Sequence, residues 1–493
     1  MGIVSSSYHH RPVYRSVDAM GNISIRNLTV TPLELKEAER LGKTVRATPS
    51  NGRGNGDSLG GSARLTANRT GGGTAPAPSD GSQKHFTGGI MIPPFSETEA
   101  PIPAPDPNAG EKLRLTFQEP GTDHRYVAEF PGPTLQSIVM RHSAGEITGK
   151  EFTVVYLPRA RYLTILSSAH LIAWMAELPS ALPVSALSIP GTHNSPTHFF
   201  ALPSVRCQAV GIRAQLDNGV RFLDIRVSCP DESLSDDNLA LVHSAFPISL
   251  TGTKWFHDLL AHVYAFLDDN PSETVLMSIK REGTGRGSDQ TLSKYLARRY
   301  FAGANTLHWY TEPRIPTLGE VRGKLVLIRR FLLDDSLRSE HGGRGLGIDG
   351  SVWPDNVADG TCGGGQIRIQ DFYDVAQTET INKKIGFAQA QLERAGQQVC
   401  VPEGMPLPIY INFLSASSFF NASCWPDKIA ARINPSIIEY LCTGHGAPGK
   451  GPGQLTIGDA GTGVVVMDWV GHDGDWDLVR CIVGWNARLQ LKG

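Results

Sequence analysis

The sequence has few cysteines, almost no excess of charge and no long apolar run, and each absence excludes a class of protein. Its seven cysteines among 493 residues are scattered, without a CxxC pair or a nearby histidine. This spacing argues against a zinc site and against a dense disulfide framework, and the odd count leaves at least one free thiol. A formal net charge of -2 provides no basic field of the kind that nucleic-acid binders carry.

No stretch reaches the roughly 20 apolar residues that a membrane-spanning helix needs. The amino terminus also lacks the apolar segment of a secretory signal. It reads MGIVSS, which fits the pattern for N-myristoylation at Gly2, although the pattern is short and an unmodified start is the alternative. We therefore expect a cytoplasmic or peripheral membrane protein, with an extracellular location as the alternative, and a flexible N-terminus over residues 1–21.

Short alternating runs separated by Pro-Gly and Gly turns indicate a β-rich accessory domain over residues 22–176. The runs include NISIRNLTV, LRLTFQE, HRYVAEF, FTVVYL and YLTILSS. They predict a small β-sandwich whose first strand precedes an insertion. That insertion, residues 49–89, is rich in Gly, Ser, Asn, Thr and Pro. Because such a segment buries little apolar surface, we expect it to be disordered.

From residue 177 to 493 the pattern becomes one of near-continuous apolar runs alternating with amphipathic helical segments. This is typical of a parallel sheet covered by helices. About eight runs in just over 300 residues predict a distorted TIM (β/α) barrel. The predicted strands are VSALSIP, VRFLDIRV, LALVHS, TVLMSIKR, KLVLIRRF, IRIQDFY, IYINFLS and GVVVMDWV. After the first of them, we expect Pro190-Gly191 to turn the chain sharply.

Polar side chains follow nearly every predicted strand, where a barrel of this class carries its chemistry. We expect them to converge on one site. They are His193, Asn194, Asp224, Arg226, His243, Lys280, Glu282, Arg330, Asp371, Tyr373, Asn412 and Asp468.

The types of these polar residues indicate which reaction the site could catalyse. Two histidines, His193 and His243, suit a reaction that needs one base and one acid near neutral pH. Three cations would bind an anion or stabilise developing negative charge, and Asp468 after a buried run would be satisfied by orienting a histidine. No GxSxG elbow or glycine-rich nucleotide loop stands between a predicted barrel strand and the helical segment after it. These features favour phosphoryl transfer in which the substrate attacks itself.

In this order, the motifs IPGTHNS, GVRFLDIRV, LALVHS, NPSETVLMSIKRE, GKLVLIRRF, IQDFY and VVVMDW resemble those of the phosphatidylinositol-specific phospholipase C X-domain family, in its bacterial-type, metal-independent branch. The resemblance begins near residue 180 and leaves the N-terminal part uncovered. It implies a TIM barrel that cleaves phosphatidylinositol at a membrane surface to diacylglycerol and a cyclic inositol phosphate, without a cofactor.

The resemblance also implies roles for the strand-end residues. His193 would be the general base for the inositol 2-hydroxyl, and His243 the general acid, oriented by Asp468. Arg226 would bind the phosphate beside Asp224. The family's inositol contacts match Lys280, Arg330, Asp371 and the stacking aromatic Tyr373.

One position departs from the bacterial pattern. Asn194 stands where the bacterial branch usually has Asp, and Asn is the residue of the calcium-dependent branch. Asn194 and Asp224 could supply oxygen ligands to calcium, but Arg226 and Lys280 would repel the ion, so a metal-free site is favoured over a calcium site.

Two other functions compete with this one: a metal-dependent phosphodiesterase of the glycerophosphodiester or sphingomyelinase D kind, and a catalytically silent lipid- or glycan-binding barrel. The first needs paired acidic ligands, for which Arg226 is awkward. The second would be expected to lack a histidine, and both are present. Phe199-Phe200 and Trp255-Phe256 fit either lipid contact at the barrel rim or core packing.

Overall fold

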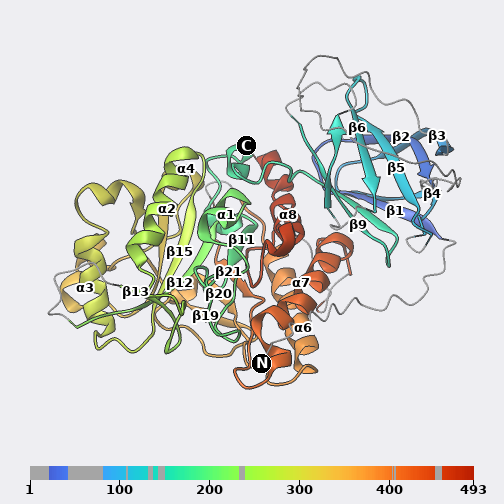
Figure 1. Cartoon of the computed structure of the whole chain (residues 1–493). Helices are drawn as coiled ribbons and strands as arrows, with labels where there is room; N and C mark the ends of the chain where they lie inside the picture. The colour runs from blue at the N-terminus through green and yellow to red at the C-terminus, as the bar shows by residue number, and fades with distance from the viewer. Residues whose placement is uncertain are drawn as a thin grey trace, which may run out of the picture.

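The computed structural model describes residues 21–42, 82–106, 109–131, 137–142, 150–231, 239–401, 404, 407–449, 453 and 458–492. Gly2, with almost all of the predicted flexible N-terminus, and most of the predicted insertion lie outside these residues. The described part of the chain contains no helix long and apolar enough to cross a membrane. Figure 1 shows a β domain beside a larger α/β domain.

The β domain is a sandwich of two five-stranded sheets, which confirms the predicted all-β fold. Strands β4 (Ser96–Pro103), β1 (Asn22–Asn27), β10 (Tyr162–Leu166), β9 (Thr153–Leu157) and β7 (Ser137–Val139) form one sheet in this order. The other has the order β3 (Ser82–Ile92), β2 (Leu33–Leu41), β5 (Lys112–Gln118), β6 (Arg125–Phe130) and β8 (Arg141–His142). Alternate apolar residues such as Ile23, Leu35 and Phe117 fill the core between the sheets.

Two details of this domain differ from the sequence prediction. Two strands, β1 and β2, precede the insertion instead of one, and residues 82–89 of the predicted insertion belong to β3. The physical reason is pairing: β3 runs antiparallel along β2 from Leu41↔Ser82 to Leu33↔Ile92, so a neighbouring strand orders a segment whose composition alone predicts disorder. The domain limits 22–176 and 177–493 stay predictions.

The α/β domain is an open, distorted TIM barrel, as predicted. Its sheet runs in the order β16 (Trp309–Tyr310), β17 (Leu325–Arg330), β15 (Val275–Arg281), β12 (Phe222–Ser228), β11 (Ile189–Thr192), β22 (Val464–Met467), β21 (Ile409–Phe413), β20 (Ile367–Gln370) and β19 (Gly360–Cys362). Neighbours pair in parallel except β19 with β20. Strand β18 (Ile348–Asp349) pairs with β17, and within the described residues no ladder joins it to β19.

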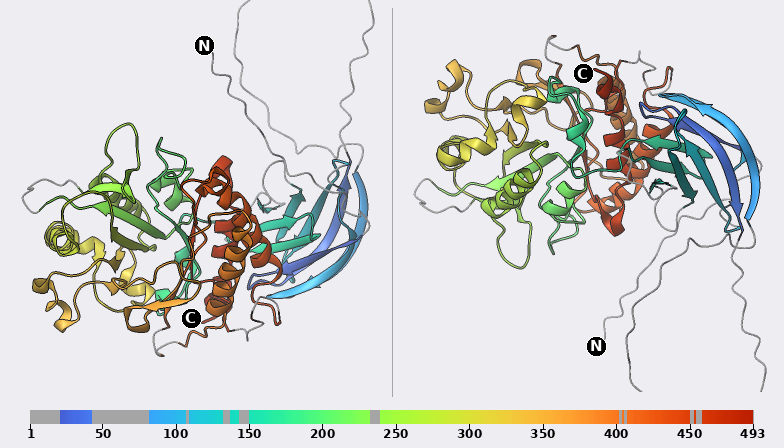
Figure 2. Two further views of the ribbon diagram at one scale, coloured as in Figure 1. Left: turned by 90° about the horizontal axis from the view of Figure 1, so that it is seen from below. Right: turned by 90° about the horizontal axis from the view of Figure 1, so that it is seen from above.

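Helices cover the outside of the barrel (Figure 2). The longer ones present apolar stripes to the sheet, as amphipathic helices do; α2, for example, buries Phe256, Leu260 and Val263. They are α1 (Ile212–Asp217), α2 (Phe256–Asp269), α3 (Asp289–Arg299), α6 (Thr380–Gly396), α7 (Pro426–Thr443) and α8 (Asp477–Gly484). Phe256 is therefore a core residue, whereas Phe200 is 73% exposed.

Two predicted strands take another form. In VSALSIP, residues Val184–Ala186 form a 3-10 helix, and the strand begins only at Ile189. Pro190 and Gly191 lie inside β11, so they do not turn the chain as predicted. Glycine is needed there because a Cβ on Gly191 would lie 2.9 Å from the Cβ of Phe222 in the adjacent strand.

The run LALVHS is not a barrel strand. It forms β13 (Ala240–His243), which pairs antiparallel with the end of β12 and makes a hairpin with β14 (Phe246–Pro247). The apolar pattern could not predict this direction, because a short buried run has the same composition in a parallel and in an antiparallel strand.

Polar contacts join the two domains. The buried Arg26 of β1 donates hydrogen bonds to the carbonyl oxygens of Cys442 (2.9 Å) and His445 (2.8 Å), at the C-terminal end of α7. Ser137 of β7 donates its backbone N–H to Asp477 Oδ1 in α8. The two bonds from Arg26 satisfy carbonyl groups at a helix end, where intrahelical donors are lacking.

Candidate active site

A cavity of about 420 Å³ lies between the domains, but the predicted strand-end residues gather at another, of about 620 Å³, at the carboxyl end of the barrel sheet. Eight of the twelve line it: His193, Arg226, His243, Lys280, Glu282, Arg330, Asp371 and Tyr373. The other four, Asn194, Asp224, Asn412 and Asp468, are buried, with at most 3% of their surface exposed. The sheet thus brings side chains from distant segments to one cavity, and the buried polar residues lie behind its wall.

His193 follows β11 and is held from two sides. Its Nδ1 lies 2.9 Å from Asp468 Oδ1, just beyond the end of β22, and Gln208 donates its amide N–H to the His193 carbonyl at 2.7 Å. If Nδ1 carries the proton and donates it to the carboxylate, Nε2 is left as an acceptor. The prediction that Asp468 orients His243 is wrong, because β11 and β22 are adjacent strands and bring Asp468 to His193 instead.

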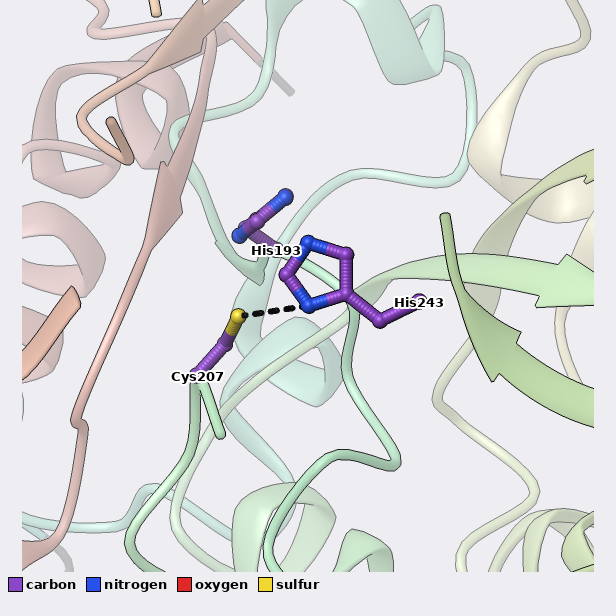
Figure 3. Close-up of side chains that lie close together, drawn as sticks. All are labelled: His193, Cys207 and His243. Atoms are coloured by element: carbon purple, nitrogen blue, oxygen red, sulfur yellow. Dashed lines mark hydrogen bonds between the residues drawn. The ribbon is translucent and has the colours of Figure 1, made fainter. Parts of the chain in front are cut away.

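His243 ends β13 and has a different partner. Its Nδ1 lies 2.8 Å from the carbonyl oxygen of Val205 and 3.7 Å from the sulfur of Cys207. A carbonyl only accepts, so the proton belongs on Nδ1. The ring centroids of His193 and His243 lie 5.8 Å apart, and Figure 3 shows the two rings edge to face.

Burial and positive charge act on both imidazoles. Burial lowers the pKa of His193 well below its ordinary value, and Arg226 lowers it further. Burial also lowers the pKa of His243, again with Arg226 adding to the effect. Both shifts follow from the cost of a charged ring in a desolvated, cationic site. At neutral pH without an anionic ligand, the neutral forms are therefore favoured.

A network of alternating charges lies beside the histidines. Asp224 Oδ2 accepts hydrogen bonds from Nε and Nη2 of Arg226, both at 3.1 Å, and Oδ1 lies 3.4 Å from Arg330 Nη1. Glu282 Oε1 contacts Arg226 Nη1 at 3.1 Å and Lys280 Nζ at 2.8 Å. Strand β12 places Asp224 and Arg226 on one face because they are two residues apart.

These cations keep the carboxylates ionised. Burial alone would raise the pKa of Asp224, but Arg226 and Arg330 lower it below its ordinary value. Burial likewise opposes ionisation of Glu282, yet Arg226 and Lys280 bring its pKa to about 2. The ion pairs with Asp224 and Glu282 hold the guanidinium of Arg226 at the cavity wall, where it can contact an anion.

The far wall of the cavity combines an aromatic ring with polar groups. The Arg330 guanidinium lies over the Trp353 ring, 3.8 Å from its centroid, and Trp353 Nε1 donates a hydrogen bond to Asp371 Oδ2 at 3.0 Å. Tyr373 is 42% exposed, and its hydroxyl donates to Asp355 at 2.7 Å. A ring, a cation and a carboxylate together suit a polyhydroxylated ligand, since its faces are apolar and its edges polar.

Asn194, the residue that departs from the bacterial pattern, is fully buried in a left-handed conformation (φ 42°). Its backbone N–H donates to Asp224 Oδ2 at 3.1 Å. Neither atom of its side-chain amide has a hydrogen-bond partner among the described residues. Both oxygens of Asp224 face guanidinium groups, so this pair does not form an anionic cage of the kind that calcium requires.

Several site residues were missed or undervalued by the sequence reasoning. Trp353, Gln208 and Cys207 lie in loops and not at strand ends, so the strand-end rule passes over them. Trp353 had one usable signal, an aromatic between small and turn-forming residues in GSVWPD. Glu282 and Asn412 were predicted to support the site; Glu282 does so directly, and Asn412 accepts a hydrogen bond from Gln370 beneath it.

The fold and site define a class: an α/β barrel with two histidines and an arginine at the carboxyl end of its strands. Residues 181–331 match the family model described as "Phosphatidylinositol-specific phospholipase C, X domain". The predicted resemblance of this segment to that family is thereby confirmed.

Bacterial proteins similar to the chain agree with this match and with the predicted bacterial type. The chain is 27% identical over 282 residues to the 1-phosphatidylinositol phosphodiesterase of Listeria monocytogenes, covering 54% of this chain and 74% of that one. It is 26% identical over 332 residues to the enzyme of the same name from Staphylococcus aureus, covering 64% and 93%. A solved Staphylococcus aureus phosphatidylinositol-specific phospholipase C superposes with a TM-score of 0.51 at 24% identity, over 64% of this chain and 98% of that one.

Proposed function

We propose that the protein cleaves phosphatidylinositol, or a related inositol phospholipid, to diacylglycerol and a cyclic inositol phosphate. The observation that carries this proposal is the pairing of His193 with Asp468 at 2.9 Å, opposite His243 and beside Arg226 in one cavity. The names of the two bacterial relatives support the same substrate. The reaction needs only proton transfer and charge stabilisation, and these are the groups present.

The chain's own atoms have distinct tasks in this reaction. Nε2 of His193 takes the proton of the inositol 2-hydroxyl, whose oxygen then bonds to phosphorus. The bond from phosphorus to the glycerol oxygen breaks, and protonated His243 gives its Nε2 proton to that oxygen. His243 keeps its Nδ1 proton on the Val205 carbonyl throughout. Arg226 stabilises the added charge on the phosphate, which is largest in the transition state.

We further propose that this reaction uses no metal. Arg226 and Lys280 place positive charges where a cation would have to bind beside Asp224, and the Asp224 carboxylate is engaged by two guanidinium groups. Lys280, Arg330, Asp371 and Tyr373 would bind the inositol ring, with Trp353 holding Arg330 and Asp371 in place. Asn194 supports Asp224 through its backbone.

The substrate would be met at a membrane surface. Phe419 lines the cavity and stacks on Phe246, with ring centroids 5.3 Å apart, and the adjacent Phe420 is 96% exposed. Exposed aromatic side chains at a cavity rim suit insertion into a lipid interface. One of the solved Staphylococcus aureus structures concerns the modulation of that enzyme's membrane binding.

The test is phosphorus NMR of the purified protein with phosphatidylinositol vesicles, once with a chelator and once with calcium. A cyclic inositol phosphate signal under chelation is expected. A signal only with calcium would overturn the metal-free part of the proposal. No product under either condition would overturn the substrate and favour a different diester or a binding role.

Variants identify the groups responsible. His193→Ala and His243→Ala should each lower turnover by about 10²- to 10⁴-fold, because each removes one acid or base group. His198→Ala is the matched control: His198 lies on the same loop, and its Nδ1 is 3.1 Å from the Pro196 carbonyl. Wild-type turnover in either of the first two variants would contradict the assignment.

A further inference from the structure

Cys207 is a site residue that the two-histidine chemistry does not use. It lies on the loop between β11 and α1 and is fully buried. Its backbone N–H donates to Thr197 Oγ1 at 3.1 Å, and its carbonyl accepts from the Trp469 N–H at 2.8 Å. These bonds fix the backbone on both sides, so the position of the sulfur is determined by the fold.

The sulfur faces both histidines. It lies 3.7 Å from His243 Nδ1, and one nitrogen of His193, one of His243 and the Cys207 sulfur all lie within 4.8 Å of one another. Figure 3 shows the three side chains around a common space. In a tetrahedral zinc site, the bond lengths place a sulfur and a nitrogen ligand roughly 3.5 Å apart. Small side-chain movements would therefore bring the three atoms to ligand distance.

A second feature also fits metal binding. Asp468 contacts His193 through Nδ1, which leaves Nε2 for a ligand, and metal-binding histidines commonly use a carboxylate in this way. Charges of both signs lie nearby: Arg226, Arg330 and Lys280 oppose a cation, whereas Asp224 and Glu282 favour it.

We propose that His193, Cys207 and His243 form an inhibitory site for a borderline-soft divalent cation such as Zn²⁺. Two imidazole nitrogens and a thiolate are ligands that zinc prefers, whereas calcium and magnesium prefer oxygen. Binding releases the thiol proton to solvent. It also moves the Nδ1 proton of His243 to Nε2 and breaks the hydrogen bond to Val205.

Such an ion would be an inhibitor and not a cofactor, because it occupies the Nε2 of His193 that accepts the substrate's proton. It also takes Nδ1 of His243 away from the Val205 carbonyl that orients that ring. The inhibitory effect rests on the proposed function, but metal binding itself does not. Sequence spacing could not predict this site, since the three ligands come from separate segments and none is within ten residues of another.

The test is a titration of the full, metal-stripped chain with Co²⁺, which reports thiolate coordination by a sulfur-to-cobalt charge-transfer absorption and is displaced by Zn²⁺. We expect one equivalent to bind to the wild type and the absorption to be lost in Cys207→Ser. Cys442→Ser is the matched control, because Cys442 is also a buried thiol but lies 3.8 Å from the sulfur of Cys481 and not beside the two histidines. An unchanged absorption in Cys207→Ser, or none in the wild type, would overturn the site.

Activity provides the second readout. Zn²⁺ should inhibit turnover, a chelator should restore it, and Ca²⁺ and Mg²⁺ should have no such effect. Relative to its own uninhibited rate, Cys207→Ser should need at least about tenfold more Zn²⁺, since even the loss of an outer-shell partner weakens metal binding 10- to 100-fold. Cobalt binding without inhibition by Zn²⁺ would overturn the inhibitory role. Cobalt binding in a protein with no turnover under any condition would instead refute the proposed function.

Discussion

At the scale of single residues, the two histidines differ in what holds their second nitrogen. His193 has a carboxylate and His243 a backbone carbonyl. The carboxylate stabilises an imidazolium as it forms, which suits a base, whereas the carbonyl fixes a tautomer without adding charge, which suits an acid that must release its proton. The residue type alone could not assign these partners, because sequence shows neither which strands are neighbours nor which loop carbonyl faces a ring.

Asp468→Asn should lower kcat by about 10²- to 10⁴-fold with little change in KM, because it removes the group that orients and stabilises His193. Steady-state kinetics on phosphatidylinositol vesicles measures both constants. Asp473→Asn is the control, since that side chain is 90% exposed. A large rise in KM with unchanged kcat would contradict a role in the chemical step.

The pH dependence should follow the lowered pKa values of both histidines. The base must be neutral, so the acid limb of kcat/KM should lie below about pH 6.5, the ordinary histidine pKa. The general acid, His243, must be protonated, so its lowered pKa also moves the alkaline limb of kcat/KM to lower pH. Bound phosphodiester adds negative charge and should raise the pKa of His243, moving the alkaline limb of kcat to higher pH. Identical alkaline limbs in kcat and kcat/KM would contradict this.

At the scale of elements, the site depends on close packing of β11 between β12 and β22. Gly191 allows that approach because its missing side chain leaves room for Phe222. Periodicity predicted most barrel strands, since continuous apolar runs are typical of strands buried on both faces. It could not predict the direction of β13 or the start of β11, because those depend on tertiary pairing.

Gly191→Ala should destabilise the protein by about 1–3 kcal/mol, because the added methyl group overlaps Phe222. Gly386→Ala is a matched control in α6, where a Cβ meets no atom within 4 Å. This control should stabilise by about 0.5–1 kcal/mol through helix propensity. Thermal unfolding of both variants measures the difference, and a Gly191→Ala variant as stable as the wild type would contradict the close approach.

At the scale of the whole molecule, the sandwich and the barrel share buried polar contacts and not only a linker. Arg26 is the central one, with two hydrogen bonds to the end of α7. The sequence predicted both domains but not this connection, because an arginine in an alternating strand is usually an exposed residue.

Arg26→Met should lower stability by about 1–3 kcal/mol, since it leaves two carbonyl groups without their donor. Arg114→Met is the control: Arg114 pairs with Glu39 and Glu129 but is 39% exposed, so its loss should cost no more than about 1 kcal/mol. Unfolding midpoints in denaturant compare the two. Equal losses would contradict a special role for the contact between domains.

The hairpin of β13 and β14 has a consequence for how the site could diversify. The proposed base follows strand β11 of the central sheet, whereas the proposed acid is carried by a hairpin. Among the described residues, this hairpin pairs with β12 at two positions, Val227↔Leu241 and Ser228↔Ala240. Changes in the hairpin should therefore alter leaving-group departure more than the attacking step. The two proposed halves of the reaction rest on different elements, and the Val205 carbonyl, on the loop after β11, is a link between them.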